Sequence, residues 1–122
     1  MPRTCVNPLP IGAVIFKFRH RLEIGPDAAY FFENLDFPVA NRRFDAYYAQ
    51  FLPVPASSAR PHAHLGIEFL YVIAEKLVLQ MSDEPHILAT GDAVYFDSTI
   101  KHSYRSGTRR TSTALVVTTG AP

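Results

Sequence analysis

The sequence has almost none of the features of a disulfide-linked or membrane-spanning protein. Its 122 residues include a single cysteine, Cys5, so no intramolecular disulfide can form and no group of thiolates can hold a metal ion. So few cysteines suit a reducing compartment. No uninterrupted apolar run approaches the roughly 20 residues needed to cross a bilayer, and prolines interrupt the N-terminal segment where a secretory signal would be apolar. We therefore expect a cytoplasmic protein without membrane contact.

The sequence also lacks an excess of charge of either sign. Twelve basic residues face eleven acidic ones, for a formal net charge of +1, which gives no electrostatic reason to expect nucleic acid as a partner. The basic residues in 17–21 fall at alternating positions, which is typical of the solvent-exposed side of a strand. We expect no direct binding to nucleic acid.

What the sequence does contain favours β-structure with many turns. Ten prolines, nine phenylalanines and six tyrosines tilt the composition that way. Residues 25–38 are ambiguous between a short helix and an extended segment. Turns are expected at 54–61, 82–86 and 91–92, and seven or more short strands at this spacing predict a sandwich or barrel. The strands are expected within residues 13–22, 43–54, 62–73, 76–82, 86–90, 91–97, 101–106 and 111–119.

The segment "RPHAHLGIEFLYVI" (60–73) places polar groups in an apolar run, and strand parity sorts them. His62, His64 and Glu68 occupy even positions with Gly66 between them, so in one strand over 62–73 they would share a face. Two imidazoles and a carboxylate suit a divalent first-row metal. Two alternatives are open: a His-x-His pair is often merely hydrogen-bonded, and Glu68 could form an ion pair with a basic residue. The candidate partners for that ion pair are Arg60, Lys76 and Lys101.

Two segments resemble the motifs of the cupin superfamily. "HAHLGIE" (62–68) is similar to the first cupin motif, and "GDAVYFDSTIKHSYRS" (91–106) to the second, which opens on Gly-Asp and carries a histidine near the following strand. The resemblance implies an all-β, single-domain cupin: a double-stranded β-helix (jelly-roll) barrel over 43–119, with an N-terminal extension, 1–42, packing on it. It further implies one divalent transition-metal ion, whether Fe, Mn, Ni, Zn or Cu. The implied ligands are His62, His64, Glu68 and His102.

The resemblance extends to one group of cupins in particular. "GIEFLYVI", the second motif and the closing "ALVVTT" are similar to the C-terminal sensor cupin of XRE-type helix-turn-helix transcriptional regulators. Residues 1–40 show no paired-helix pattern, so we expect the sensor module by itself. The resemblance implies a cupin that holds a small organic ligand at its metal. The alternatives are a small metal-dependent enzyme of the dioxygenase or isomerase type and a structural cupin with a vestigial site.

Three further residues are candidates for lining the ligand pocket. Tyr104 shares strand parity with His102, and Tyr48 and Gln50 lie in the expected strand before the first motif. No catalytic residue is identifiable.

The odd positions of 63–73 are apolar throughout, from Ala63 to Ile73, and form a face too apolar to be left in water. Either the N-terminal 40 residues or a second subunit would cover it. Because cupins are often dimers, the resemblance to that family implies a homodimer, with the N-terminal strand contributing to the contact.

Overall fold

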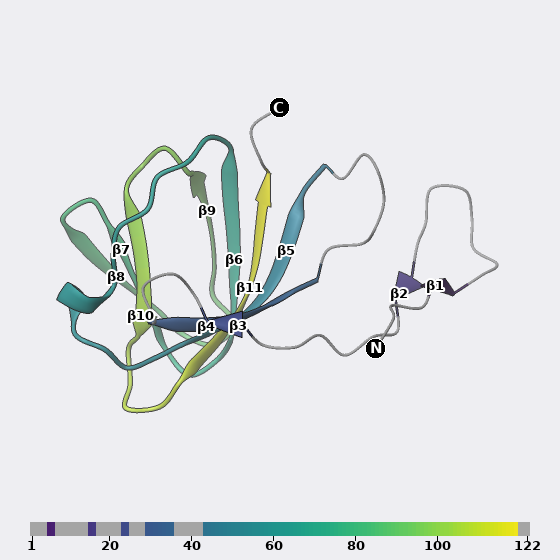
Figure 1. Cartoon of the computed structure of the whole chain (residues 1–122). Coiled ribbons are helices and arrows are strands. Elements are labelled where there is room, and N and C mark those ends of the chain that lie inside the picture. Colours follow the sequence, from purple (N-terminus) through teal and green to yellow (C-terminus); the bar gives the residue numbers. More distant parts are fainter. Residues whose placement is uncertain (1–4, 7–14, 17–22, 25–28, 36–42, 120–122) are drawn as a thin grey trace.

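A computed structural model of the chain describes residues 5–6, 15–16, 23–24, 29–35 and 43–119. These residues form two facing antiparallel sheets and a separate pair of two-residue strands (Figure 1). The small pair is β1 (Cys5–Val6) with β2 (Ile15–Phe16). The larger sheet has the order β3 (Glu23–Ile24), β4 (Tyr30–Asn34), β5 (Asp45–Phe51), β11 (Ser112–Thr119), β6 (Ile67–Ala74), β9 (Ala93–Asp97). The smaller sheet has the order β10 (His102–Ser106), β7 (Leu77–Met81), β8 (Glu84–Leu88).

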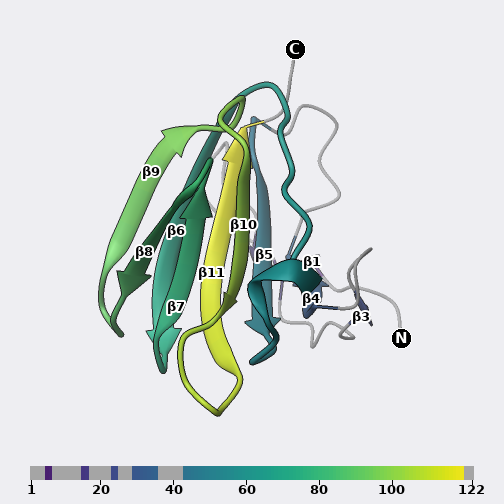
Figure 2. The ribbon, with the colours of Figure 1, turned by 90° about the vertical axis from the view of Figure 1, so that its left-hand side faces the viewer.

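The core lies between the two sheets, as expected for the all-β jelly-roll predicted from the sequence. In Figure 1, β7, β8 and β10 lie on one side and β6, β11 and β5 on the other; Figure 2 shows the same two layers one behind the other. Leu70 and Val72 of β6 are fully buried, as is Leu77 of β7. The only helical turn in the described part of the chain is the short 3₁₀ segment η1 (Ala56–Ser58) in the loop after β5. Within the described residues no helix is long and apolar enough to span a membrane.

Alternation along β6 follows the predicted parity. Glu68, Leu70 and Val72 point inward and are buried, whereas the odd positions from Ile67 to Ile73 are 37–42% exposed on the outer face of the sheet. A strand of period two has one face in the core and the other outside, which is why one run of sequence carries both a polar group and an apolar surface.

The strand is shorter than the predicted 62–73, and this is a correction. β6 begins at Ile67, residues 63–66 are irregular, and His62 forms only an isolated bridge with His102. Gly66 explains the break: its φ is +108°, outside the extended region, and an added Cβ would lie 1.8 Å from the carbonyl oxygen of Thr119. Shared parity in one strand is therefore not what brings His64 close to Glu68.

Three other predicted segments can be compared with the structure. In 25–38 the described residues 29–35 contain β4, so the extended alternative is the observed one there. The turn expected at 82–86 is only two residues long, because Ser82 adopts a positive φ of 51° and β8 starts at Glu84. In 13–22 only the two residues of β2 are described, and the rest of that predicted strand lies outside the described residues.

Candidate metal centre and pocket

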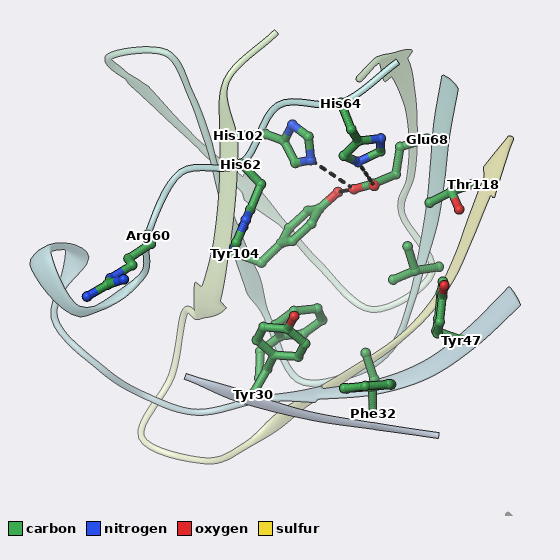
Figure 3. Close-up of a pocket in the computed structure, with 13 residues that line it drawn as sticks. Tyr30, Phe32, Tyr47, Arg60, His62, His64, Glu68, His102, Tyr104 and Thr118 are labelled. Carbon is green, nitrogen blue, oxygen red and sulfur yellow. Dashed lines mark hydrogen bonds and ion pairs between the residues drawn. The ribbon is translucent and has the colours of Figure 1, made fainter. Parts of the chain in front are cut away.

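Three side chains from separate parts of the sequence converge at one end of the space between the sheets. His64 comes from the irregular segment before β6, Glu68 from the second position of β6, and His102 from the first position of β10 (Figure 3). Nε2 of His64 lies 3.4 Å from Oε1 of Glu68, and Nε2 of His102 lies 3.5 Å from Oε2. One candidate ligand atom from each residue lies within 4.8 Å of the other two, close enough for a single metal ion to reach all three.

Backbone hydrogen bonds hold the two contributing segments together. The amide of His62 donates to the carbonyl of His102 at 2.8 Å, and the amide of His102 donates back at 2.9 Å. The amide of His64 donates to the carbonyl of Ser98 at 2.9 Å, and the amide of Ser98 donates to the carbonyl of Gly66. The irregular segment is thus fastened to residues 98–102, which places the first and second motifs against each other.

The other ring nitrogen of each histidine fixes which tautomer faces the cluster. Nδ1 of His102 lies 2.7 Å from the carbonyl oxygen of Ile100, and Nδ1 of His64 lies 3.3 Å from that of Leu65. A carbonyl oxygen only accepts, so each Nδ1 carries the proton, and in the neutral ring Nε2 presents a lone pair to the carboxylate. Lone pairs facing a carboxylate repel it unless a cation or a proton lies between them. This arrangement of Nδ1 held by a carbonyl and Nε2 free is the usual one for a histidine that binds a metal.

Without a metal, the same contacts hold a proton between His102 and Glu68. Burial lowers the pKa of His102, but the hydrogen bond with Glu68, the Ile100 carbonyl and the carboxylate charge outweigh it, and the pKa is raised above its ordinary 6.5. Burial raises the pKa of Glu68, yet hydrogen bonds from His102 and Tyr104 and the charges of both histidines leave it below its ordinary 4.5. The site therefore favours a negative carboxylate with a positive group beside it.

Tyr104 completes the surroundings of Glu68. Its hydroxyl donates a hydrogen bond to Oε2, the same oxygen that faces His102. Burial, the adjacent carboxylate charge and this hydrogen bond all raise the pKa of Tyr104, so the phenol stays protonated and acts as a donor. Because Oε2 already accepts this bond, the phenol restrains the carboxylate and fixes its orientation.

The cluster opens into a cavity of about 490 Å³ between the sheets. This volume lies within the roughly 300–1,000 Å³ usual for small-molecule sites. The cavity has a polar end at the cluster and a largely aromatic remainder that also includes the polar side chains of Arg60, His62 and Thr118 (Figure 3). The lining residues outside the cluster are Tyr30, Phe32, Tyr47, Ala49, Phe51, Arg60, His62, Tyr104, Val116 and Thr118.

The structure places the predicted site residues differently from one another. His64, Glu68 and His102 form the cluster, Tyr104 is bonded to it, and His62 lines the same cavity without being one of the three. Tyr48 and Gln50 do not line the cavity; their neighbours Tyr47, Ala49 and Phe51 do. Adjacent residues of a strand point to opposite faces, so the register of β5 directs the odd positions inward.

The sequence alone did not indicate that the aromatic residues of β4 line the cavity. Tyr30 and Phe32 line the cavity because β4 pairs with β5, which brings Phe32 opposite Ala49. The only signal in the sequence was the alternation of Tyr30 and Phe32 in a segment that could also have been helical.

A family model of the Cupin domain matches residues 50–118, more than half of the chain. The chain belongs to the Cupin_2 family. No curated protein matches this cupin in sequence. The family match starts within β5 and includes His64, Glu68 and His102, whereas β4 lies before the matched residues.

Solved structures share the fold of this cupin at low sequence identity. The Fe(II) form of HppE superposes with a TM-score of 0.72 at 18% identity, over 93% of this chain and 63% of that one. The polyketide cyclase RemF from Streptomyces resistomycificus gives 0.71 at 21%, over 84% and 75%. The Cupin_2 domain of an XRE family transcriptional regulator from Enterobacter cloacae gives 0.64 at 21%, over 77% and 98%. This cupin thus spans under two thirds of HppE but nearly the whole of the regulator's domain.

Proposed function

We propose that this cupin binds one divalent transition-metal ion at His64, Glu68 and His102 and holds a small organic ligand against it, as a binding or sensor module. The observation that carries the proposal is the tautomer pattern: two Nε2 atoms, each with its Nδ1 engaged by a carbonyl, converge on one buried carboxylate. Three protein ligands leave coordination positions open toward the cavity for water or an oxygen donor. When bound, the ion would act as a Lewis acid toward that donor.

His62 is our proposed fourth ligand. Its backbone is paired with that of His102 and its side chain lines the same cavity as the cluster. A set of three imidazoles and one carboxylate is compatible with Fe, Mn, Ni, Zn or Cu, so the metal has to be identified by experiment.

The decisive experiment is metal analysis of matched histidine variants. The purified protein, metal-stripped and titrated with Zn²⁺, Mn²⁺ and Fe²⁺ under anaerobic conditions, should bind one ion, and His102→Ala should lose at least about a hundred-fold in affinity. His62→Ala should lose less if it is the fourth ligand. His86→Ala is the control, because His86 is half exposed on β8 and lies outside the cavity. No stoichiometric binding, or equal binding by all variants, refutes the metal site and leaves a structural cupin with a vestigial site.

A metal-dependent enzyme is the second candidate function, and two of the similar solved structures support it. The two with TM-scores above 0.7 described above are HppE, in an Fe(II) form, and a protein named as a polyketide cyclase. The regulator's Cupin_2 domain, almost all of which this chain spans, favours the binding module instead. Oxygen consumption by the iron-loaded protein with a panel of phenols and small carboxylates separates the two: turnover supports a dioxygenase, and binding without turnover supports the module. An isomerase would require product analysis of the same mixtures.

We also propose a cytoplasmic homodimer that contacts through the outer face of β6. Ile67, Phe69, Tyr71 and Ile73 leave a continuous apolar surface there, and Tyr95 of the neighbouring β9 is 70% exposed beside it. Residues 1–42 are proposed to pack on the 43–119 barrel and to contribute to the contact. Light scattering at micromolar concentration should give twice the chain mass, and Phe69→Glu should give the monomer. A monomeric parent protein would contradict the proposal.

A further inference from the structure

The aromatic side chains of the cavity form one continuous series of ring contacts. The series runs from the cavity floor, which is the end opposite the candidate metal site, to His102 of that site. Phe32 meets Tyr47 edge-on at 5.9 Å between ring centres, and Tyr30 lies 6.0 Å from Phe32 and 5.8 Å from Phe51. From there Phe51 lies 5.2 Å from Tyr104. The series ends at His102, whose ring is 5.9 Å from that of Tyr104.

The floor of this series is built by residues outside the matched Cupin domain. Tyr30 and Phe32 lie on β4, and Tyr47 on the first half of β5, all before residue 50 where the family match begins. Figure 3 shows Tyr30 and Phe32 across the cavity from His64, Glu68 and His102. The part of the cavity farthest from the cluster is therefore built largely by residues that precede the family match.

Two observations distinguish this floor from ordinary core packing. Phe51 is 3% exposed and belongs to the core, whereas Tyr30 and Phe32 pack against that core but are only half-buried. Both also line the cavity. Beside them Ala49 of β5 and Val116 of β11 present small apolar side chains to the cavity, while Tyr47 and Thr118 of the same strands add hydroxyl groups to its lining.

We propose that Tyr30 and Phe32 are specificity-determining residues that make the cavity select a ligand with a planar aromatic body, whose oxygen donors reach the cluster. The inference rests on the proposed function, because the cluster supplies the end at which the oxygen donors are bound. Offset and edge-to-face contacts with aromatic rings favour a planar π-system over a saturated ring of similar size. A flat body lying in the cavity over the rings of Tyr30 and Phe32 would bury a face against them.

The test compares benzoate with its saturated counterpart, cyclohexanecarboxylate, on the metal-loaded protein. Each carries one carboxylate and no other donor, so the ratio of their dissociation constants compares the aromatic ring with the saturated ring. Calorimetry should give benzoate an advantage of about ten-fold, and Tyr30→Leu and Phe32→Leu should each reduce the ratio about three-fold. Leucine keeps these positions apolar, and the thermal transition of each variant checks that it folds. Phe44→Leu is the control, because Phe44 is exposed and does not line the cavity.

The possible results distinguish a failure of the proposed aromatic selectivity from a failure of the proposed metal binding. Metal binding with a ratio near one, or a ratio that both leucine variants leave unchanged, overturns the aromatic selectivity while the metal site stands. Failure to bind metal overturns the proposed function instead, and it is detected in the metal titration before any organic probe is added. A reduced ratio in Tyr30→Leu and Phe32→Leu, with metal affinity and the Phe44→Leu ratio unchanged, supports the inference.

Discussion

The break before β6 can be tested by replacing Gly66 with alanine, with Gly91→Ala as a matched control. Both glycines have similar positive φ angles, +108° and +90°, which cost a non-glycine residue roughly 1–3 kcal/mol. They differ in space: a Cβ at Gly91 would meet nothing within 4 Å, whereas one at Gly66 would lie 1.8 Å from the carbonyl oxygen of Thr119. The difference between the two variants therefore isolates the steric clash.

The size of that difference follows from what holds Thr119 in place. To relieve the clash, the end of β11 has to move by more than an ångström, and Thr119 is paired with Ile67 and accepts a hydrogen bond from its amide at 3.0 Å. Losing this bond costs about 0.5–1.5 kcal/mol, and the adjoining ladder contact adds a similar amount. We expect Gly91→Ala to lower the free energy of unfolding by about 1–3 kcal/mol, and Gly66→Ala to lower it by about 1–3 kcal/mol more than Gly91→Ala does.

Urea denaturation of metal-free protein measures both variants, followed by a metal titration. Gly66 separates two proposed ligands, His64 and Glu68, so its variant should also bind metal more weakly, while Gly91→Ala should bind it normally. Equal midpoints for the two variants would falsify the argument that the close approach of Thr119 requires a glycine at position 66.

Two further predictions concern pH and the core. The raised pKa of His102 stabilises the metal-free protein. This contribution is fully present below the ordinary pKa of 6.5 and is lost as pH rises through the raised value. The lowered pKa of Glu68 also stabilises the protein, and this contribution is present above 4.5 and is lost as pH falls through the lowered value. Thermal melts should thus show this contribution largest between about pH 4.5 and 6.5, while metal affinity should rise with pH above 6.5 because protons compete for His102; a flat metal affinity would contradict the assignment. Leu70→Ala should cost about 2–5 kcal/mol in urea denaturation, because Leu70 is fully buried. Ile87→Ala, at a 71% exposed position, should cost under about 0.5 kcal/mol, and a similar loss in both would show that Leu70 does not pack as described.

The all-β class and most strand positions were predictable because they depend on local patterns. Alternation of apolar residues places one face of β6 in the core whatever its partners are, and the sequence shows that alternation directly. Where a strand begins is harder to predict. The start of β6 depends on Gly66, which has a positive φ and where a Cβ would clash with Thr119, a residue 53 positions later in the sequence. Local parity could not reveal that contact.

The candidate site shows the same division. His64, Glu68 and His102 could be proposed from residue type and motif, since these side chains suit a metal wherever they meet. That Tyr47 rather than Tyr48 lines the cavity depends on which face of β5 meets the core, and both faces of that strand carry a tyrosine. The two positions do not differ decisively in sequence. Which tyrosine faces the cavity therefore depends on how β5 pairs with β4 and β11 in the sheet.

By itself, the sequence determined the chemical character of this protein: strands of period two, no thiolate site, and a histidine-rich motif paired with a second histidine. Residue type and alternation act locally, so they can be read without the fold. Only the tertiary structure decided which groups meet. It fastens 62–66 to 98–102 so that two imidazoles face one carboxylate, and it lays β4 across the opposite end of the cavity. Those arrangements depend on contacts between residues distant in sequence, which no local pattern encodes.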